Sequence, residues 1–138
     1  MQLNEMGSIV RECRLEIPHH FPGVELHAHV VMPNHVHGIL VIHGRARHAV
    51  PLRNTGASVE AFGNPVAGSL PTIIRSFKAT VSKRVHAVDR RPANQVWQRN
   101  YYEHVIRTGA EFDEVSRYIW ENPKVWEFDE ENPDRRGR

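Results

Sequence analysis

The sequence predicts an α+β domain in which helices cover one face of an antiparallel sheet. Two apolar, β-branched runs on either side of Pro33 and Asn34 suggest a hairpin. Three other segments have apolar residues at intervals of three and four, which is typical of amphipathic helices. With residues 96–107 as a third strand or extended segment, the expected order is helix, strand, strand, helix, strand, helix. With 138 residues, the chain is long enough for one core but not for two ordinary ones.

The composition is that of a globular protein, with 40% hydrophobic and 25% charged residues. The apolar runs are shorter than a membrane span, and the N-terminus has no signal-peptide pattern, so we expect a cytoplasmic protein without a membrane partner. Cys13 is the single cysteine, which excludes an internal disulfide and a cysteine-built zinc site. We expect residues 1–126 to form the domain, with a long flexible loop at 44–68 and a charged, frayed tail at 127–138.

The chain begins with an expected amphipathic helix, which Pro18 should end. Its apolar stripe consists of Leu3, Met6, Val10, Cys13 and Ile17. The first strand should follow from Val24, where apolar and polar residues alternate. That alternation places His27 and His29 on the polar face, as solvent-exposed side chains.

The second strand of the hairpin contains a pair of histidines. Because alternate residues of a strand share a face, His35 and His37 should point the same way and Val36 the other. Two neutral imidazoles on one face can bind one cation. The chain has ten histidines, however, so a pair two residues apart can also arise by chance.

A second helix should begin at Ser69, which is a good N-cap. Its apolar stripe lies beside four basic residues, Arg75, Lys78, Lys83 and Arg84. Residues 75–107 contain eight Lys/Arg against two Asp/Glu, whereas residues 111–134 contain two Lys/Arg against nine Asp/Glu. A basic segment suits a phosphate backbone, but it can equally be a solvated surface.

Residues 96–107 are rich in aromatic and β-branched residues and predict a strand or an extended segment. Trp97, Tyr101 and Tyr102 could stack on bases while Arg99 contacts phosphates, as in proteins that bind single strands. The alternative is that these aromatics belong to the core.

The third helix should begin at the capping box formed by Thr108 and Glu111 and end at Pro123. Tyr118 and Asn122 are four residues apart and share one side of it. If this helix lies near the histidine strand, His35, His37 and Asn122 could hold a metal ion that keeps positions open for phosphate oxygens. Tyr118 would then be a nucleophile that forms a phosphotyrosine link, and a later hydroxyl could reverse that link and join strands.

Four motifs resemble those of one protein family. They are Met-Pro-Asn-His-Val-His-Gly (32–38), Ile-Arg-Ser-Phe-Lys (74–78), Val-Trp-Gln-Arg-Asn-Tyr-Tyr-Glu-His-Val-Ile-Arg (96–107) and Arg-Tyr-Ile-Trp-Glu-Asn-Pro (117–123). In this order they are similar to the motifs of the single-tyrosine HUH transposases, and more narrowly of the REP-associated tyrosine transposases. The resemblance extends from Leu3 to Trp126.

The resemblance implies a metal-dependent endonuclease and strand transferase that acts on single-stranded DNA with hairpins. It assigns His35, His37 and Asn122 as ligands of Mg²⁺ or Mn²⁺, and Tyr118 as the nucleophile that becomes linked to a DNA 5′ phosphate. It also implies a ferredoxin-like (RRM-like) fold and a monomer or homodimer. Family members begin with a strand before the first helix, and here the helix starts almost at Met1, so the expected sheet lacks that strand.

Other interpretations of the same residues are open. The chain could be a catalytically idle domain that binds single-stranded nucleic acid. A hydrolase of the histidine-triad type needs a third alternate histidine, but Ile39 occupies that position. Tyr101 and Tyr102 are rival nucleophiles, although they have no ligand partner at helical spacing.

Overall fold

A computed structural model describes residues 3–43, 68–90, 96–130 and 132. The loop expected at 44–68 lies outside this range except for Gly68, as do residue 131 and residues 133–138 of the expected tail. The elements are α1 (Glu5–Leu15), α2 (Ile17–His20), β1 (Val24–Val31), β2 (Val36–Ile42), α5 (Leu70–Asp89), α6 (Gly109–Val125) and the short 3-10 helix η2 (Trp126–Phe128). The α+β class is confirmed.

Strands β1 and β2 form the expected antiparallel hairpin, which is paired from Val24 with Ile42 to Val31 with Val36. The backbone N–H of Met32 donates to the carbonyl of His35 at 2.8 Å and closes the turn over Pro33–Asn34. Proline presets the backbone angle that such a turn needs, which explains why the chain reverses here.

A bulge interrupts β1 between Leu26 and His29. An extra residue in one strand reverses which side chains face each side of the sheet. His27 accordingly faces α6, where its ring lies 5.2 Å from that of Phe112. His29 faces α1 instead, and its pKa is lowered by burial and by nearby Arg14. The prediction that His27 and His29 share a solvent-exposed face is therefore wrong.

Arg14 of α1 lies under the bulge and is only 5% exposed. Its guanidinium donates a 2.7 Å hydrogen bond to the carbonyl of His27. Burial lowers the pKa of Arg14. Gly38 leaves room for this side chain, because a Cβ at residue 38 would lie 3.4 Å from the Arg14 Nε. The hydrogen bond from Arg14 thus joins α1 to the hairpin.

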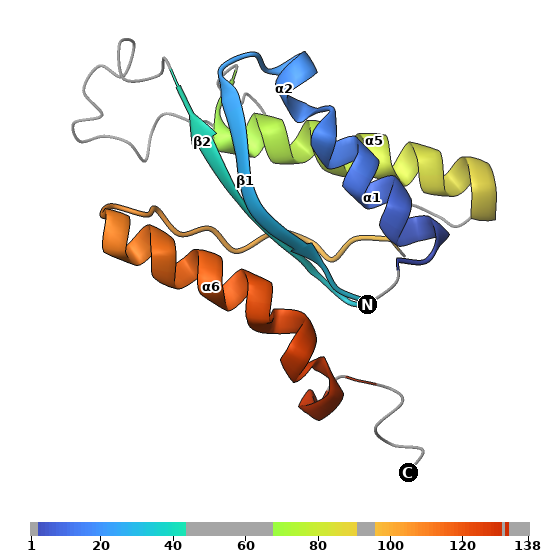
Figure 1. Ribbon diagram of the computed structural model, residues 1–138. Coiled ribbons are helices and arrows are strands. Elements are labelled where there is room, and N and C mark those ends of the chain that lie inside the picture. The colour runs from blue at the N-terminus through green and yellow to red at the C-terminus, as the bar shows by residue number, and fades with distance from the viewer. Residues whose placement is uncertain (1–2, 44–67, 91–95, 131, 133–138) are drawn as a thin grey trace.

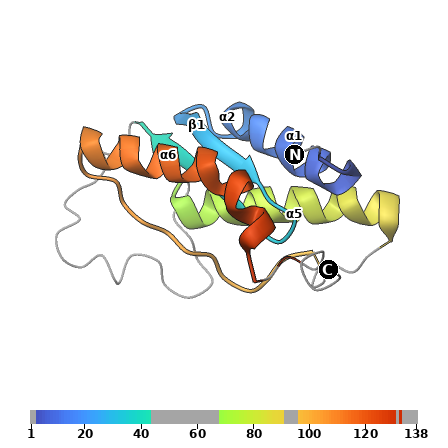
Figure 2. The same ribbon diagram turned by 60° about the horizontal axis from the view of Figure 1, so that its bottom comes forward.

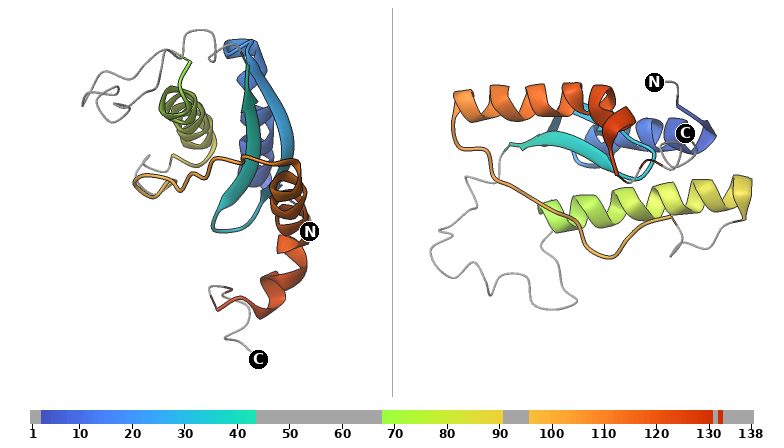
Figure 3. Two further views of the ribbon diagram at one scale, coloured as in Figure 1. Left: turned by 90° about the vertical axis from the view of Figure 1, so that its left-hand side faces the viewer. Right: turned by 90° about the horizontal axis from the view of Figure 1, so that it is seen from below.

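Helices α1 and α5 pack against one face of the hairpin, and α6 packs against the other (Figure 1). Two buried clusters lie on the first face: Val10, Cys13, Val81 and Val85, which contact Val31 and Val36, and Ile17, Val24 and Ile73, which contact Leu26, Leu40 and Ile42. The view in Figure 2 separates α6 from α5, and Figure 3 (left) shows α1 behind the strands. The prediction that all helices cover one face is wrong, because α6 covers the second face. Strand β2 has apolar side chains on both faces, such as Leu40 on one and Ile39 on the other, and both faces need cover.

The predicted N-caps are confirmed. The Ser69 hydroxyl accepts from the N–H of Thr72 at 3.4 Å, and the Thr108 hydroxyl accepts from the N–H of Glu111 at 3.1 Å. The carboxylate of Glu111 also accepts from the N–H of Arg107 at 2.8 Å. Together these bonds satisfy N–H groups at the start of α6 that have no partner within the helix.

Both prolines that were expected to end helices lie inside helical segments. Pro18 is in the first turn of α2, where its missing N–H costs nothing, and α1 has already ended at Leu15. Pro123 lies within α6, which continues to Val125. Buried Ile119 and Trp126 lie on either side of it, so packing maintains the helix through the proline.

A short helical turn follows the third helix, within the first residues of the expected tail. Residues Trp126–Phe128 form η2, and the buried Asn132 donates from its side-chain amide to the carbonyl of Trp126 at 3.0 Å. The described part of the chain beyond residue 126 therefore folds back onto the end of α6.

Residues 96–107 form no strand, and within residues 3–43, 68–90, 96–130 and 132 the sheet consists of β1 and β2 alone. The segment is held to α5 instead, because the Trp97 indole N–H donates to the carbonyl of Lys78 at 3.1 Å. None of the described helices is long and apolar enough to cross a bilayer.

The buried face of α5 should determine stability. Ile73 is 0% exposed, so Ile73→Ala should lower the free energy of unfolding by about 2–5 kcal/mol, measured by urea denaturation. Val88→Ala is the matched control on the same helix: this side chain is 52% exposed, and its loss should change stability by no more than about 0.5 kcal/mol. Equal losses in both variants would contradict the packing described here.

Candidate functional site

The hairpin turn positions His35 and His37 on the face of the sheet that α6 covers. Their rings have centroids 4.7 Å apart and an interplanar angle of 72°. Val36, between them, packs against the opposite cluster with α1 and α5. The prediction that the two histidines share a face is confirmed.

His35 contacts its neighbour in the turn. Its Nδ1 lies 2.6 Å from the side-chain oxygen of Asn34. An amide oxygen only accepts hydrogen bonds, so in a neutral ring this contact favours the tautomer with the proton on Nδ1 and the lone pair on Nε2. Histidines that bind metals typically have this arrangement, in which one ring nitrogen donates to a second group and the other is free for the ion.

His37 is favoured in its neutral form. Burial lowers its pKa, and the neighbouring imidazole of His35 lowers it further. A neutral imidazole can donate its lone pair to a cation, whereas a protonated one cannot. His37 is therefore suited to act as a metal ligand.

Tyr118 of α6 completes the contact. Its ring centroid lies 5.6 Å from that of His37 at an angle of 70°, and the residue is 59% exposed. The start of α6 is anchored nearby by the ring contact of Phe112 with His27. The Tyr118 side chain is therefore open to solvent while its ring lies beside His37.

Asn122 lies one helical turn beyond Tyr118 and is only 6% exposed. Its side-chain amide forms no hydrogen bond with another described residue. Ser116, on the same helix, is buried too, and among the described residues its hydroxyl has no hydrogen-bond partner. A buried polar group without a partner is rare in folded proteins, so the Ser116 hydroxyl is a group that a ligand could satisfy.

Ser116 was not predicted from the sequence as a site residue. The signal was available, since Ser116 is the polar residue within the apolar pattern of Phe112, Val115 and Ile119. A polar residue at a core-facing helical position needs either a partner or a role.

The donor set at this site fits a divalent cation. Two imidazoles leave coordination positions open for oxygen ligands such as water and phosphate, which manganese and magnesium bind. No group of three His, Cys, Asp or Glu side chains that could hold a metal occurs in the described residues. Asn122 is the residue that the sequence predicts as a third ligand.

The residues expected to bind DNA fall into two groups. Arg75, Lys83, Arg99, Tyr101 and Tyr102 are exposed, whereas Lys78 donates to the carbonyl of Asn100 at 2.6 Å. Arg84 instead donates to both carboxylate oxygens of Glu16 at 2.7 Å, and this bond lowers the pKa of Glu16. Trp97 packs against Phe77 with ring centroids 5.7 Å apart. Arg84 and Trp97 thus connect elements of the fold.

The rival nucleophiles lie elsewhere. Tyr101 lines a pocket on α5, and α5 packs on the hairpin face opposite α6. Tyr102 is exposed to solvent. Within the described residues neither ring contacts His35 or His37, so Tyr118 is the tyrosine that the fold places beside the pair.

A protein of Haemophilus influenzae, described as an uncharacterized protein, is 37% identical to this chain over 132 residues. The match covers 94% of this chain and 71% of the Haemophilus protein. The chain therefore belongs to the same family as that protein. No model of a known protein family and no solved structure matches the chain.

The lowered pKa of His37 should make stability depend on pH. As the pH falls, His37 takes up a proton in the unfolded chain near its ordinary pKa of about 6.5. In the folded protein it takes up the proton at a lower pH. The stability linked to His37 is thus complete above that pH and is lost as the pH falls toward the folded-state pKa. Urea unfolding between pH 7.5 and 5 should show a shallower decline in His37→Gln than in the native protein. Identical slopes would contradict this.

Proposed function

We propose that this protein is a metal-dependent endonuclease and strand transferase for single-stranded DNA, with Tyr118 as its nucleophile. The main support is the ring contact between His37 and the exposed Tyr118, beside a second histidine with a free Nε2. The sequence motifs of this chain also resemble those of the REP-associated tyrosine transposases. If water were the nucleophile, the reaction would need metal ligands but no tyrosine beside them.

The reaction is a phosphoryl transfer. The Tyr118 oxygen attacks a phosphorus atom of the DNA backbone and loses its proton to solvent, and the bond from phosphorus to the 3′ oxygen breaks. The 3′ oxygen leaves as a hydroxyl, and the 5′ phosphate remains bound to Tyr118. Because the new ester retains the bond energy, another 3′ hydroxyl can attack it and release the tyrosine. DNA transposition needs both steps, cleavage and rejoining.

His35, His37 and Asn122 would hold Mg²⁺ or Mn²⁺. The ion would supply positive charge at the phosphate oxygens and favour the ionised tyrosine, whose reference pKa is about 10. This charge is needed here, because the surface of α6 around Tyr118 includes exposed Asp113, Glu114 and Glu121. Carboxylates repel a phosphate backbone, so the site would bind DNA poorly without a cation.

The proposal extends to fold and partners. The order of helix, hairpin, helix, extended segment and helix supports a ferredoxin-like (RRM-like) arrangement. The substrate would be single-stranded DNA with a hairpin, and the protein would act in the cytoplasm as a monomer or homodimer.

The second candidate is a catalytically idle domain that binds single-stranded DNA. The exposed basic residues Arg75 and Lys83 on α5 favour it, since they are independent of the histidine site. Such a domain would bind DNA equally well with and without metal and would form no covalent product.

Substitution of the nucleophile tests the reaction. Tyr118→Phe should reduce the covalent protein–DNA product to background on a denaturing gel with Mn²⁺ and labelled hairpin DNA. DNA affinity should change by no more than about tenfold, because only a hydroxyl is removed. Tyr101→Phe and Tyr102→Phe keep their rings and should still form the product. A covalent product in Tyr118→Phe would refute the assignment.

Removal of the metal tests the ligands. EDTA should abolish the covalent product, and added Mn²⁺ should restore it. His35→Ala should weaken Mn²⁺ binding, measured by calorimetry, by at least about tenfold, since even indirect partners of ligands have effects of that size. His19→Ala, at an exposed position on α2, is the control and should bind Mn²⁺ as the native protein does. Full activity in EDTA would contradict a metal-dependent reaction.

A further inference from the structure

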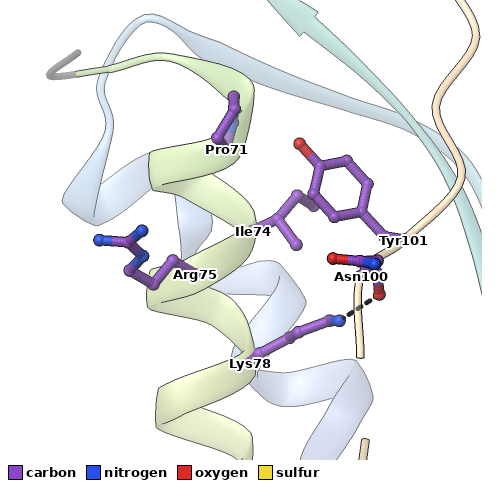
Figure 4. Close-up of a pocket in the computed structure, with 6 residues that line it drawn as sticks. All are labelled: Pro71, Ile74, Arg75, Lys78, Asn100 and Tyr101. Atoms are coloured by element: carbon purple, nitrogen blue, oxygen red, sulfur yellow. Dashed lines mark hydrogen bonds between the residues drawn. The ribbon is translucent and has the colours of Figure 1, made fainter. Parts of the chain in front are cut away.

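A pocket on α5 lies apart from the histidine site. It has a volume of about 290 Å³ and is lined by Pro71, Ile74, Arg75, Lys78, Asn100 and Tyr101 (Figure 4). The helix supplies one side, and the segment that follows Trp97 supplies the other. Small-molecule sites usually have volumes of about 300–1,000 Å³, so this pocket suits one planar ring and not a duplex.

The walls of the pocket are largely apolar. Ile74 and the ring of Tyr101 point toward one another, with Pro71 beyond them at the start of the helix. The Tyr101 ring is partly open to solvent. An aromatic ring that is supported from one side and open on the other is a surface on which a nucleobase can stack.

The pocket is formed before any ligand binds. Lys78 donates from its Nζ to the carbonyl of Asn100 at 2.6 Å and to that of Gln98 at 3.2 Å. Asn100 has a φ of 67°, a left-handed conformation that turns the chain and positions Tyr101. The Nζ of Lys78 lies 6.0 Å from the centre of the Tyr101 ring. These contacts reduce the entropy that binding would otherwise cost.

The charge of the pocket is positive. Arg75 is exposed and has no ion pair with any described residue, and none of the six lining residues is acidic. Two of the three N–H groups of Lys78 donate to carbonyls, so the guanidinium of Arg75 has more N–H groups available to an anion. Guanidinium groups bind phosphate in a bidentate manner.

We infer that this pocket binds one unpaired nucleotide of the single-stranded DNA substrate, with its base on Tyr101 and Ile74 and its phosphate on Arg75. The inference rests on the proposed function for the identity of the ligand. It does not depend on the chemistry at Tyr118, because α5 packs on the opposite face of the hairpin. The pocket would hold a nucleotide away from the cleaved bond and so contribute affinity.

Binding of a fluorescently labelled trinucleotide in EDTA, followed by fluorescence anisotropy, tests the pocket without cleavage. Tyr101→Ala should weaken binding by about 5- to 150-fold, the usual range for loss of one stacked base. Arg75→Gln should also reduce the slope of log affinity against log salt by about 0.7, as expected for one phosphate contact on a single strand. Trp120→Ala and Arg11→Gln remove an exposed aromatic and an exposed cation outside the pocket, and they should leave affinity unchanged.

A trinucleotide whose three bases are replaced by abasic sites should bind as weakly to the native protein as the normal trinucleotide binds to Tyr101→Ala. Equal affinity of the native protein for both trinucleotides would mean that it binds phosphate alone, which overturns the inference. Equal losses in Tyr101→Ala and Trp120→Ala would also overturn it. The covalent product is measured separately with Mn²⁺. If that product never forms but the pocket variants behave as expected, the nucleotide pocket stands and the role of Tyr118 falls.

Discussion

The hydrogen bond from the buried Arg14 to the carbonyl of His27 connects the first helix to the hairpin where the strand register shifts. The bulge at this point decides which side chains of the far half of β1 face α6. Beyond it Val30 pairs with His37, so Val30 shares the α6 face with that histidine, whose own direction follows from the alternation of β2. Without the bulge, the far half of β1 would present the opposite set of side chains to α6. The side chains that β1 presents beside His37 therefore depend on this shift of register, which Arg14 contacts from the other face of the sheet.

Local features of the fold could be predicted from the sequence, and features set by distant contacts could not. Ser69 and Thr108 begin helices because each hydroxyl accepts from an N–H three residues later, a pattern visible in the sequence itself. The exposure of His29 was mispredicted, because nothing in the alternation of β1 shows an inserted residue. Pro123 was expected to end a helix, but buried residues on both sides of it maintain the helix. Tertiary packing outweighs a local preference at that position.

The same distinction applies to the candidate site. The spacing of His35 and His37 on one strand was enough to predict their common face. That spacing could not show the contact with Tyr118, which joins β2 to a helix far along the chain. Arg84 was predicted to contact phosphate because it is basic. Its partner Glu16 lies 68 residues away in the sequence, so the pairing was not visible there. A charge count cannot separate a basic residue that is already neutralised from one that is free.

Cys13, the single cysteine of the chain, can be used to measure how often the core opens. Cys13 lies in the cluster between α1 and α5, and burial raises the pKa of its thiol. The thiolate is the reactive form, so the folded protein should resist alkylation at this residue. Modification then requires α1 to separate from α5, and its rate measures how often that opening occurs. The protein thus contains a natural probe of local unfolding that requires no substitution.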